Sequence, residues 1–338
     1  MTRGNRPLTV AIDASWLRDG GIARMAHEII NRAPDHVRVV EIRGGRANAG
    51  LLTPVDLAIA ARGVDADVIW SPGFMPPMAR APGKRIYITI HDLTHLHSYS
   101  AAHRLYFNRI IRPLLANVDR VFTVSEYTRQ EILLWATISP DRVIRVHNGV
   151  TAMDRLPAHD RATQAPPYVL YVGNRRPYKN IDRMIEAFGR SKFAARGGQL
   201  WLTGACDPAI DGLVRQAGVA DRVRYLGWLS DDELAATYAE SRALIFVSLY
   251  EGFGLPVVEA MTAGCPVLTA NTTALAEVAG DAALTVNPLS VEEIAEGLDR
   301  VALDDVLRAR LRSAGLERAT QFSWDRCAVR YWQVLTGT

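Results

Sequence analysis

Residues 243–268 read ALIFVSLYEGFGLPVVEAMTAGCPVL and show how the chain alternates between strand and helix. The pattern predicts an apolar strand at Ala243–Ser248, a glycine-bearing loop, a short helix and a second strand. Pro256 suits the first turn of that helix, and Gly264 suits its C-terminal cap. Because the helix begins directly after the loop, its unpaired amides and positive dipole end form an anion site.

Two carboxylates, Glu251 and Glu259, stand eight residues apart around this loop. Gly252 and Gly254 let the backbone approach a ligand closely or adopt a positive φ. We expect Glu259 in the first turn of the helix, where an ionised carboxylate can accept hydrogen bonds from a vicinal diol. A ligand that binds a phosphate at the amides and a ribose diol at the carboxylate is a nucleotide sugar. The alternative is an ordinary strand–loop–helix whose acidic residues favour the dipole.

Strand and helix alternate through the rest of the chain as well, which is typical of parallel sheets covered by helices. Residues 151–167 lose this periodicity and are predicted to form a linker between two halves. Expected strands in the first half are Leu8–Ala14, Val37–Glu41, Asp67–Trp70, Arg85–Ile90, Arg120–Val124 and Val143–Val146. Expected strands after the linker are Tyr168–Val172, Gln199–Thr203 and Val223–Leu226.

Three helix starts carry recognisable caps. Thr53 followed by Pro54 predicts a capping residue and a proline at the first helical position. The spacings Ser230-x-x-Glu233 and Ser290-x-x-Glu293 predict two capping boxes.

The composition favours a two-domain cytoplasmic protein. Hydrophobic residues make up 49% and charged residues 22% of the 338 residues, which is ordinary for a soluble globular chain. The N-terminus lacks an apolar signal-peptide core, and every apolar run is of strand length, which predicts no transmembrane helix. Cys206, Cys265 and Cys327 are widely spaced and look like reduced core residues.

Charge is divided unevenly between the two halves. Residues 1–165 carry a net charge of +6, and residues 166–338 carry −3. A basic first half is compatible with a membrane surface or an anionic acceptor. We expect no nucleic-acid partner, because the tight Arg/Lys clusters with interleaved aromatic residues that such a partner needs are absent from the sequence.

Residues 251–267, EGFGLPVVEAMTAGCPV, closely resemble the Glu-x7-Glu signature of glycosyltransferase family 4, whose members are retaining transferases with the GT-B fold. The resemblance implies an α/β protein of two Rossmann-like domains, with parallel sheets facing across a cleft that holds the active site. It implies an acceptor-side domain at residues 1–163, a nucleotide-sugar domain at 164–320, and a helix at 321–338 that packs back on the N-terminal domain.

A Rossmann dinucleotide-binding site has a similar pattern, because Gly252-Phe-Gly254 follows a strand and precedes a helix. That motif needs a third glycine, and this chain has Val257 in its place. Because the motif is incomplete, we reject an NAD site.

The segment Gly173-Asn-Arg-Arg-Pro-Tyr-Lys179 follows the first strand of the second half, at the strand end where open α/β sheets bind ligands. Two arginines and a lysine can neutralise a diphosphate there, although a solvated basic turn is the alternative. The segment looks like the family's phosphate loop. The match assigns Lys179 to the diphosphate. The family's arginine corresponds to Arg175 or Arg176, because the spacing in this loop varies between members.

Three further segments match the family more loosely. Thr89-Ile-His91 ends a strand, and the matching histidine faces the reacting sugar in relatives, whereas a lone histidine is usually a core or capping residue. The pair Gly20-Gly21 resembles the glycine loop that closes over the donor phosphate. Leu226-Gly-Trp-Leu229 resembles the loop that holds the nucleobase through main-chain groups, where Trp228 either packs or stacks.

The resemblance thus implies a metal-independent, retaining hexosyltransferase without a cofactor. It places Glu251 and His91 at the transferred sugar, Arg175 and Lys179 at the diphosphate, and Glu259 at the ribose. The remaining donor contacts that it implies are Gly21, Gly173, Leu229, Gly252, Phe253, Gly254 and Leu255. The sequence has no HExxH or CxxC pattern and no carboxylate pair suited to hydrolysis.

Similarity to mannosyltransferases of bacterial surface polysaccharides favours GDP-mannose as the donor and a glycan or polyprenyl-diphosphate-linked glycan as the acceptor. Another GDP- or UDP-hexose, a nucleotide-sugar epimerase and a non-catalytic nucleotide-sugar-binding protein stay open. The segment His103–Phe122 combines arginines with leucines and isoleucines. It is either a core helix, broken or kinked at Pro113, or a peripheral contact with the anionic inner face of a membrane.

Overall fold

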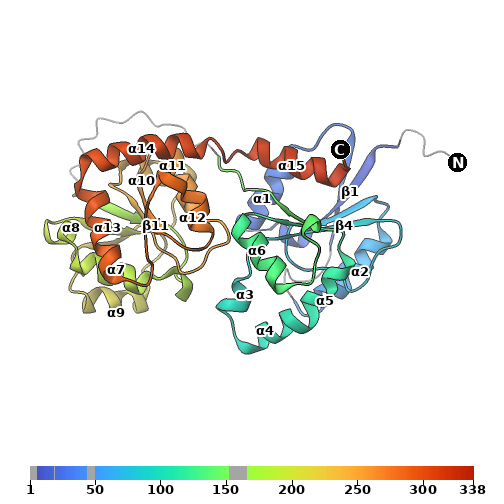
Figure 1. The fold of residues 1–338 in the computed structure, drawn as a ribbon, viewed down its shortest axis with the longest axis horizontal. Coiled ribbons are helices and arrows are strands. Elements are labelled where there is room, and N and C mark those ends of the chain that lie inside the picture. The colour runs from blue at the N-terminus through green and yellow to red at the C-terminus, as the bar shows by residue number, and fades with distance from the viewer. Residues whose placement is uncertain (1–5, 19, 44–49, 152–165) are drawn as a thin grey trace. The chain divides into compact units, whose positions relative to one another are not determined.

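The computed structural model describes residues 6–18, 20–43, 50–151 and 166–338, which fall into two compact units (Figure 1). Unit 1 comprises Met1–Gly149 and Ser323–Thr338, and unit 2 comprises Val150–Phe322. The chain therefore returns to unit 1 for its last helix. The boundary expected at residue 163 and most of the linker expected at 151–167 lie outside the described residues.

Unit 1 is built on a parallel sheet whose described strands run in the order β2-β1-β3-β4-β5-β6. These strands are β1 (Leu8–Asp13), β2 (Val37–Ile42), β3 (Val68–Ser71), β4 (Arg85–Ile90), β5 (Arg120–Thr123) and β6 (Val143–Arg145). Its helices are α1 (Gly20–Ile30), α2 (Thr53–Gly63), α3 (Thr94–His97), α4 (Ala101–Tyr106), α5 (Arg112–Leu114), α6 (Glu126–Trp135) and α15 (Trp324–Thr336).

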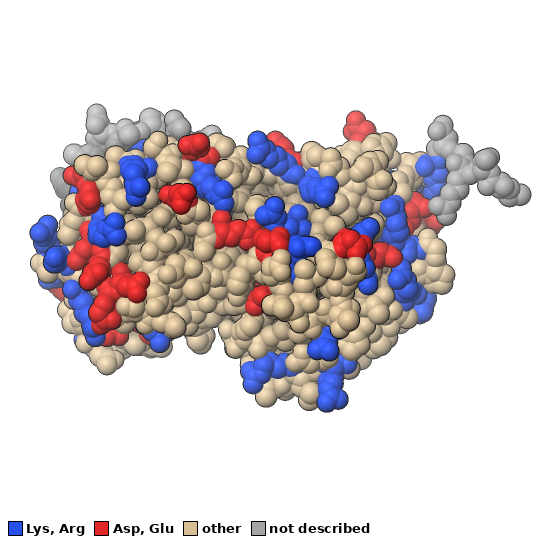
Figure 2. Space-filling view, viewed as in Figure 1, with Lys and Arg blue, Asp and Glu red and all other residues tan. Residues whose placement is uncertain are grey.

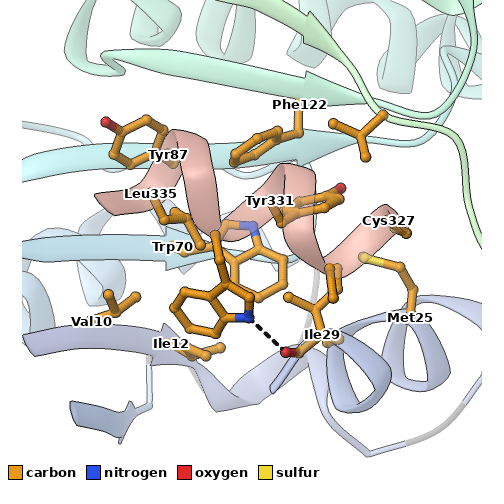
Figure 3. Close-up of a cluster of buried hydrophobic side chains, with 14 of the residues drawn as sticks. Val10, Ile12, Met25, Ile29, Trp70, Tyr87, Phe122, Cys327, Tyr331 and Leu335 are labelled. Atoms are coloured by element: carbon orange, nitrogen blue, oxygen red, sulfur yellow. Dashed lines mark hydrogen bonds between the residues drawn. The ribbon is translucent and has the colours of Figure 1, made fainter. Parts of the chain in front are cut away.

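Helix α15 supplies part of the core of unit 1, although it lies far from the sheet in sequence (Figure 3). The fully buried ring of Tyr331 has its centroid 4.2 Å from that of Phe122 and 5.2 Å from that of Trp70. The indole N–H of Trp332 donates to the carbonyl of Ile29 at 2.9 Å. Large aromatic side chains bury the most apolar area per residue, so they hold the terminal helix on the sheet.

Unit 2 contains a second parallel sheet, whose described strands run in the order β12-β11-β10-β7-β8-β9. These strands are β7 (Tyr168–Tyr171), β8 (Gln199–Leu202), β9 (Val223–Tyr225), β10 (Leu244–Phe246), β11 (Val267–Ala270) and β12 (Leu284–Val286). Its helices are α7 (Ile181–Arg190), α8 (Lys192–Ala195), α9 (Pro208–Gln216), α10 (Asp231–Glu240), α11 (Leu255–Thr262), α12 (Thr273–Ala279), α13 (Val291–Leu303) and α14 (Asp305–Ala319).

The strand order of unit 2 reverses between its neighbouring strands β7 and β10. The chain first builds β7, β8 and β9 toward one edge of the sheet and then crosses over to build β10, β11 and β12 toward the other. Two loops that leave the carboxyl ends of adjacent strands in opposite directions open a crevice, which is where open α/β sheets bind ligands. In unit 1 the corresponding reversal lies between β1 and β3.

The strands predicted from sequence are present to within two or three residues, whereas one helix start was predicted wrongly. Thr53 is the first residue of α2 and not its cap, because Leu52 takes the cap position without a side-chain hydrogen bond. The capping box of Ser230 and Glu233 is confirmed. The second box is half formed, because Ser290 caps α13 while the Glu293 carboxylate accepts from the amide of Asn287.

The cysteines also differ from the prediction in one case. Cys265 and Cys327 are buried, but Cys206 is exposed and its thiol donates to the Asp211 carboxylate at 3.1 Å. Within the described ranges, no helix has the length and apolar character needed to cross a membrane.

Candidate active site

A buried ion pair occupies the point where the strand order of unit 2 reverses. Lys179 ends the loop after β7, and Glu251 lies in the loop after β10. The Lys179 Nζ lies 2.5 Å from Glu251 Oε1, with 11% and 13% of the two side chains exposed. The sequence placed both residues in the site, but it assigned them to different parts of the donor and did not predict that they pair. Opposite charges at this distance offset the cost of burying each other.

Asn180 fixes the geometry of this pair. It takes the left-handed conformation, with φ of 60°, in which asparagine is among the few tolerated residues. Its fully buried amide donates to the carbonyls of Val247 at 2.9 Å and Pro288 at 2.7 Å. The amide of Leu249 in turn donates to the carbonyl of Tyr178 at 2.8 Å. The loops after β7 and β10 are thereby tied together by the residues on either side of Lys179.

Helix α11 presents its amino end beside this pair. Gly254 precedes it with φ of 97° and has no side chain with which to cap the first amides. A Cβ built there would lie 2.5 Å from Leu275 Cδ2, so glycine is required by both conformation and space. Pro256 has no amide hydrogen and the Val257 amide donates to the Gly254 carbonyl at 3.0 Å, so the Leu255 amide is the donor that the start of α11 offers to an anion.

Glu259 does not lie in the first turn of α11, so that prediction was wrong by one turn. The helix begins at Leu255, which makes Glu259 its fifth residue. Its half-buried carboxylate accepts a hydrogen bond at Oε2 from the phenol of Tyr238 at 3.3 Å. Tyr238 lies on α10 and is fully buried. No local pattern in the sequence indicates this contact, since the two residues lie on different helices.

The two arginines of the phosphate loop are placed differently. Arg175 donates to the carbonyls of Ala205 at 2.7 Å and Thr203 at 2.9 Å, and its guanidinium lies over the ring of Tyr225. Its Nε is buried and has no hydrogen-bond partner among the described residues. Arg176 is exposed. The Nη1 and Nη2 groups of Arg175 thus bind the loop after β8, and its Nε–H remains a donor for another acceptor.

The other candidates of unit 2 line the same carboxyl edge. Gly173 has φ of 147° in the loop after β7, where a side chain would be strained. Phe253 is buried against Phe322, so only its backbone can face a ligand. Leu229 is half-buried in the loop after β9. The adjacent Trp228 is 93% exposed, so the packing alternative was wrong and its stacking on a base stays a prediction.

His91 follows β4 in unit 1, and its Nε2 lies 2.9 Å from the carbonyl of Pro72. Because a carbonyl only accepts, the proton of the neutral ring resides on Nε2 and leaves Nδ1 as an acceptor. Burial lowers the pKa of His91, against the opposing effects of the Pro72 carbonyl and the Asp92 carboxylate. The imidazole is therefore neutral near pH 7. Gly21 is the second residue of α1.

The sequence also missed a buried carboxylate at the strand reversal of unit 1. Asp13 Oδ1 accepts from the amide of Ser15 at 3.1 Å and from its hydroxyl at 2.6 Å. Asp13 Oδ2 accepts from the hydroxyl of Ser71 at 3.1 Å. The ends of β1 and β3 are thus joined through one fully buried side chain. An acidic residue that ends an otherwise apolar strand was the available signal.

The lowered pKa of His91 makes a prediction about stability. Below about pH 6.5 the unfolded chain binds a proton at this position more readily than the folded protein, so the free energy of unfolding falls as the pH is lowered. His91→Gln retains a donor for the Pro72 carbonyl but cannot be protonated. We expect its urea midpoint to drop less between pH 7.5 and 5.5 than that of the wild type. Equal drops would show that His91 does not titrate in this way.

Comparison with known proteins agrees with this geometry. Residues 154–318 match the family described as Glycosyl transferases group 1, and residues 18–152 match Glycosyltransferase Family 4. The O-antigen chain mannosyltransferase B of Escherichia coli is 31% identical over 301 residues, which span 83% of this chain and 77% of that protein. This chain is a family 4 glycosyltransferase.

Two further proteins resemble this glycosyltransferase. The MMP alpha-(1->4)-mannosyltransferase of Mycolicibacterium hassiacum is 31% identical over 63% of this chain and 53% of that protein. The structure of HepE from Anabaena in complex with UDP and glucose superimposes with a TM-score of 0.77 at 16% identity, over 98% of this chain and all of that one. The latter likeness shows that the two sheets of this glycosyltransferase belong to a GT-B fold.

Proposed function

We propose that this glycosyltransferase moves mannose, with retention at the anomeric carbon, from GDP-mannose to a glycan or polyprenyl-diphosphate-linked glycan of a surface polysaccharide. The observation that carries the proposal is the buried pair of Lys179 and Glu251 at the strand reversal of unit 2, beside the uncapped start of α11. A cation and the positive amino end of a helix suit a diphosphate, and a carboxylate beside them suits sugar hydroxyls.

In the proposed reaction, the bond between the anomeric carbon and the β-phosphate oxygen breaks, and its electron pair stays on the phosphate. The acceptor hydroxyl bonds to the anomeric carbon from the same face and gives its proton to the departing phosphate. Negative charge therefore grows on the diphosphate. Lys179, the Nε–H of Arg175 and the Leu255 amide stabilise that charge, which is the main way a protein lowers such a barrier. His91 remains the family-based prediction for a sugar contact.

The choice of donor rests on the relatives. Two of them, from Escherichia coli and Mycolicibacterium hassiacum, are named as mannosyltransferases. The HepE structure contains UDP and glucose, which supports a nucleotide sugar in this fold and favours a UDP-hexose as the second candidate.

A panel of nucleotide sugars tests the proposal. Wild-type protein is incubated with GDP-mannose, other GDP-hexoses and UDP-hexoses in the presence of a mannose-terminated oligosaccharide, and released GDP or UDP is measured. We expect GDP release from GDP-mannose, with an α-linked product by NMR. Epimerised donor without release would indicate an epimerase, and binding without turnover of any donor would indicate a non-catalytic protein. UDP release alone would move the assignment to the second candidate.

We further propose a peripheral contact of unit 1 with the anionic inner face of a membrane. The segment Ala101–Asn117 runs from α4 through a π turn at Phe107–Ile111, which precedes Pro113, into α5 and a 3-10 turn. None of the residues of α4 is buried, and Leu105 is 60% exposed. The interpretation as a core helix therefore fits only the buried side chains further along the segment, such as Phe107.

The start of α2 extends this surface. The phenol of Tyr106 lies 3.5 Å from the carbonyl of Leu51, and both Leu51 and Leu52 are exposed. Figure 2 shows basic side chains over the lobe that α4 and α5 form. Toward α3, Glu131 Oε1 lies 2.9 Å from His97 Nε2. Apolar side chains next to arginines suit the boundary between acyl chains and anionic headgroups.

Removing the arginines should weaken the membrane contact in a charge-dependent way. We expect wild-type protein to co-sediment with phosphatidylglycerol vesicles more than with phosphatidylcholine vesicles, and less at high salt. Each arginine near an anionic surface contributes about 1 kcal/mol, so the triple change to serine at Arg104, Arg109 and Arg112 should abolish the preference. The matched control changes three exposed arginines of unit 2, Arg196, Arg215 and Arg310, to serine. Equal sedimentation of both triple variants would contradict the proposal.

A further inference from the structure

A buried tyrosine contacts Glu259, the carboxylate that the resemblance to the family places at the ribose. The Tyr238 phenol is fully buried in unit 2, and its oxygen lies 3.3 Å from Glu259 Oε2. The contact joins α10 to α11, which are separate helices. Because a buried hydroxyl without a partner is costly, the phenol and the carboxylate constrain each other.

Tyr238 is itself held in place from several directions. The hydroxyl of Ser241 donates to the Tyr238 carbonyl at 2.8 Å and lies 3.0 Å from the thiol of Cys265, just beyond the end of α11. The phenol of Tyr168 donates to the carbonyl of Thr237 at 2.8 Å. A capping box fixes the start of the helix. The backbone around Tyr238 is therefore held by contacts to β7 and to the segment after α11. The Tyr238 hydroxyl thus has a defined position from which to bind the Glu259 carboxylate.

The direction of the hydrogen bond follows from protonation. Burial, together with the Glu259 carboxylate, raises the pKa of Tyr238 well above its usual range, so the phenol stays neutral and can donate. An ionised carboxylate accepts at about four lone-pair positions. One phenol and two ribose hydroxyls therefore fit on the same group. A free glutamate side chain also has considerable rotamer entropy to lose on binding, and a neighbour that already restrains it reduces that loss.

We infer that Tyr238 is a positioning residue which orients Glu259 toward the ribose diol and so gives the donor site its preference for ribonucleotides over deoxyribonucleotides. The inference rests on the proposed role of Glu259. It assigns Tyr238 no contact with the donor: its effect passes through the carboxylate. A merely structural tyrosine would change stability or overall affinity but would not change the discrimination between the two kinds of nucleotide.

The test is the ratio of the dissociation constants for 2′-deoxy-GDP and GDP, measured by calorimetry on the full-length protein. We expect a wild-type ratio of about ten or more, because a site built to bond a hydroxyl leaves a polar group unpaired when that hydroxyl is missing. Tyr238→Phe should lower the ratio about threefold or more, the value of one hydrogen bond. Glu259→Gln should bring it close to one, and the double variant should match Glu259→Gln.

Tyr168→Phe is the matched control. It removes the phenol of another buried tyrosine that bonds α10 but does not touch Glu259, so its ratio should equal that of the wild type. Urea midpoints of both variants separate a shared loss of stability from a change in ratio. A wild-type ratio in Tyr238→Phe, with the ratio lost in Glu259→Gln, would overturn the inference and leave the proposed function standing. A wild-type ratio in Glu259→Gln would overturn the ribose assignment itself. If the protein prefers UDP, UDP and 2′-deoxy-UDP replace the guanine pair.

Discussion

Lys179→Ala should lower the turnover of this glycosyltransferase about tenfold or more, which corresponds to at least 1.4 kcal/mol of transition-state stabilisation. The change removes a cation that we assign to the diphosphate and leaves the largely buried Glu251 carboxylate without its partner. Loss of a charged partner in a buried pair is more costly than the net value of the pair. The variant should therefore also unfold at a lower urea concentration than the wild type.

Lys192→Ala provides the control, because Lys192 is an exposed lysine at the start of α8 in the same unit. We expect it to retain wild-type turnover and stability. Steady-state rates of nucleotide release at saturating donor distinguish the two variants. If Lys179→Ala kept near-wild-type turnover, Lys179 would have no part in the reaction.

Substitution of the two glutamates should affect different quantities: turnover for Glu251 and nucleotide affinity for Glu259. Glu251→Gln should mainly reduce kcat, because the neutral amide no longer balances Lys179 or holds the transferred sugar with a charged acceptor. Glu259→Gln should mainly weaken the binding of free nucleotide, because it removes a charged acceptor for the ribose hydroxyls. Loss of a hydrogen bond to a charged group costs about 1.5–3 kcal/mol, which corresponds to a tenfold or greater change.

Calorimetry with free GDP and UDP separates these effects, because neither ligand carries the transferred sugar. Glu251→Gln should bind nucleotide with an affinity close to that of the wild type. If Glu259→Gln bound both nucleotides as tightly as the wild type, the ribose assignment would be wrong. If Glu251→Gln lost nucleotide affinity instead, Glu251 would act through the Lys179–diphosphate contact and not through the sugar.

Much of the fold was predictable because the local patterns agree with the tertiary structure. Strands such as Arg85–Ile90 are rich in β-branched and aromatic residues, as expected for buried strands, and β4 has these bounds. The start of α2 was not predictable from Thr53, because the cap was taken by Leu52 without any side-chain bond. Patterns of single residues fix the existence of an element better than its first residue.

The site was predictable as a set of residues but not as a set of contacts. Lys179, Glu251 and Glu259 could be chosen because their spacing and strand-end positions are visible in the sequence. Lys179 and Glu251 are 72 positions apart in the sequence, and the hydrogen bond from Tyr238 to Glu259 joins two different helices. Such contacts depend on which strands become neighbours, which local patterns do not encode. The reversal between β7 and β10 creates the first contact.

The central claim is that a nucleotide sugar binds at the carboxyl edge of the unit 2 sheet, between the loops after β7 and β10. Hydrogen–deuterium exchange of the full-length protein, with and without saturating GDP-mannose, measures this directly. We predict slower exchange of the amides in the two loops, Gly173–Lys179 and Gly252–Glu259, and no change at the opposite strand edge around Arg242. Protection confined to Arg242 and its neighbours, with both loops unchanged, would contradict the account.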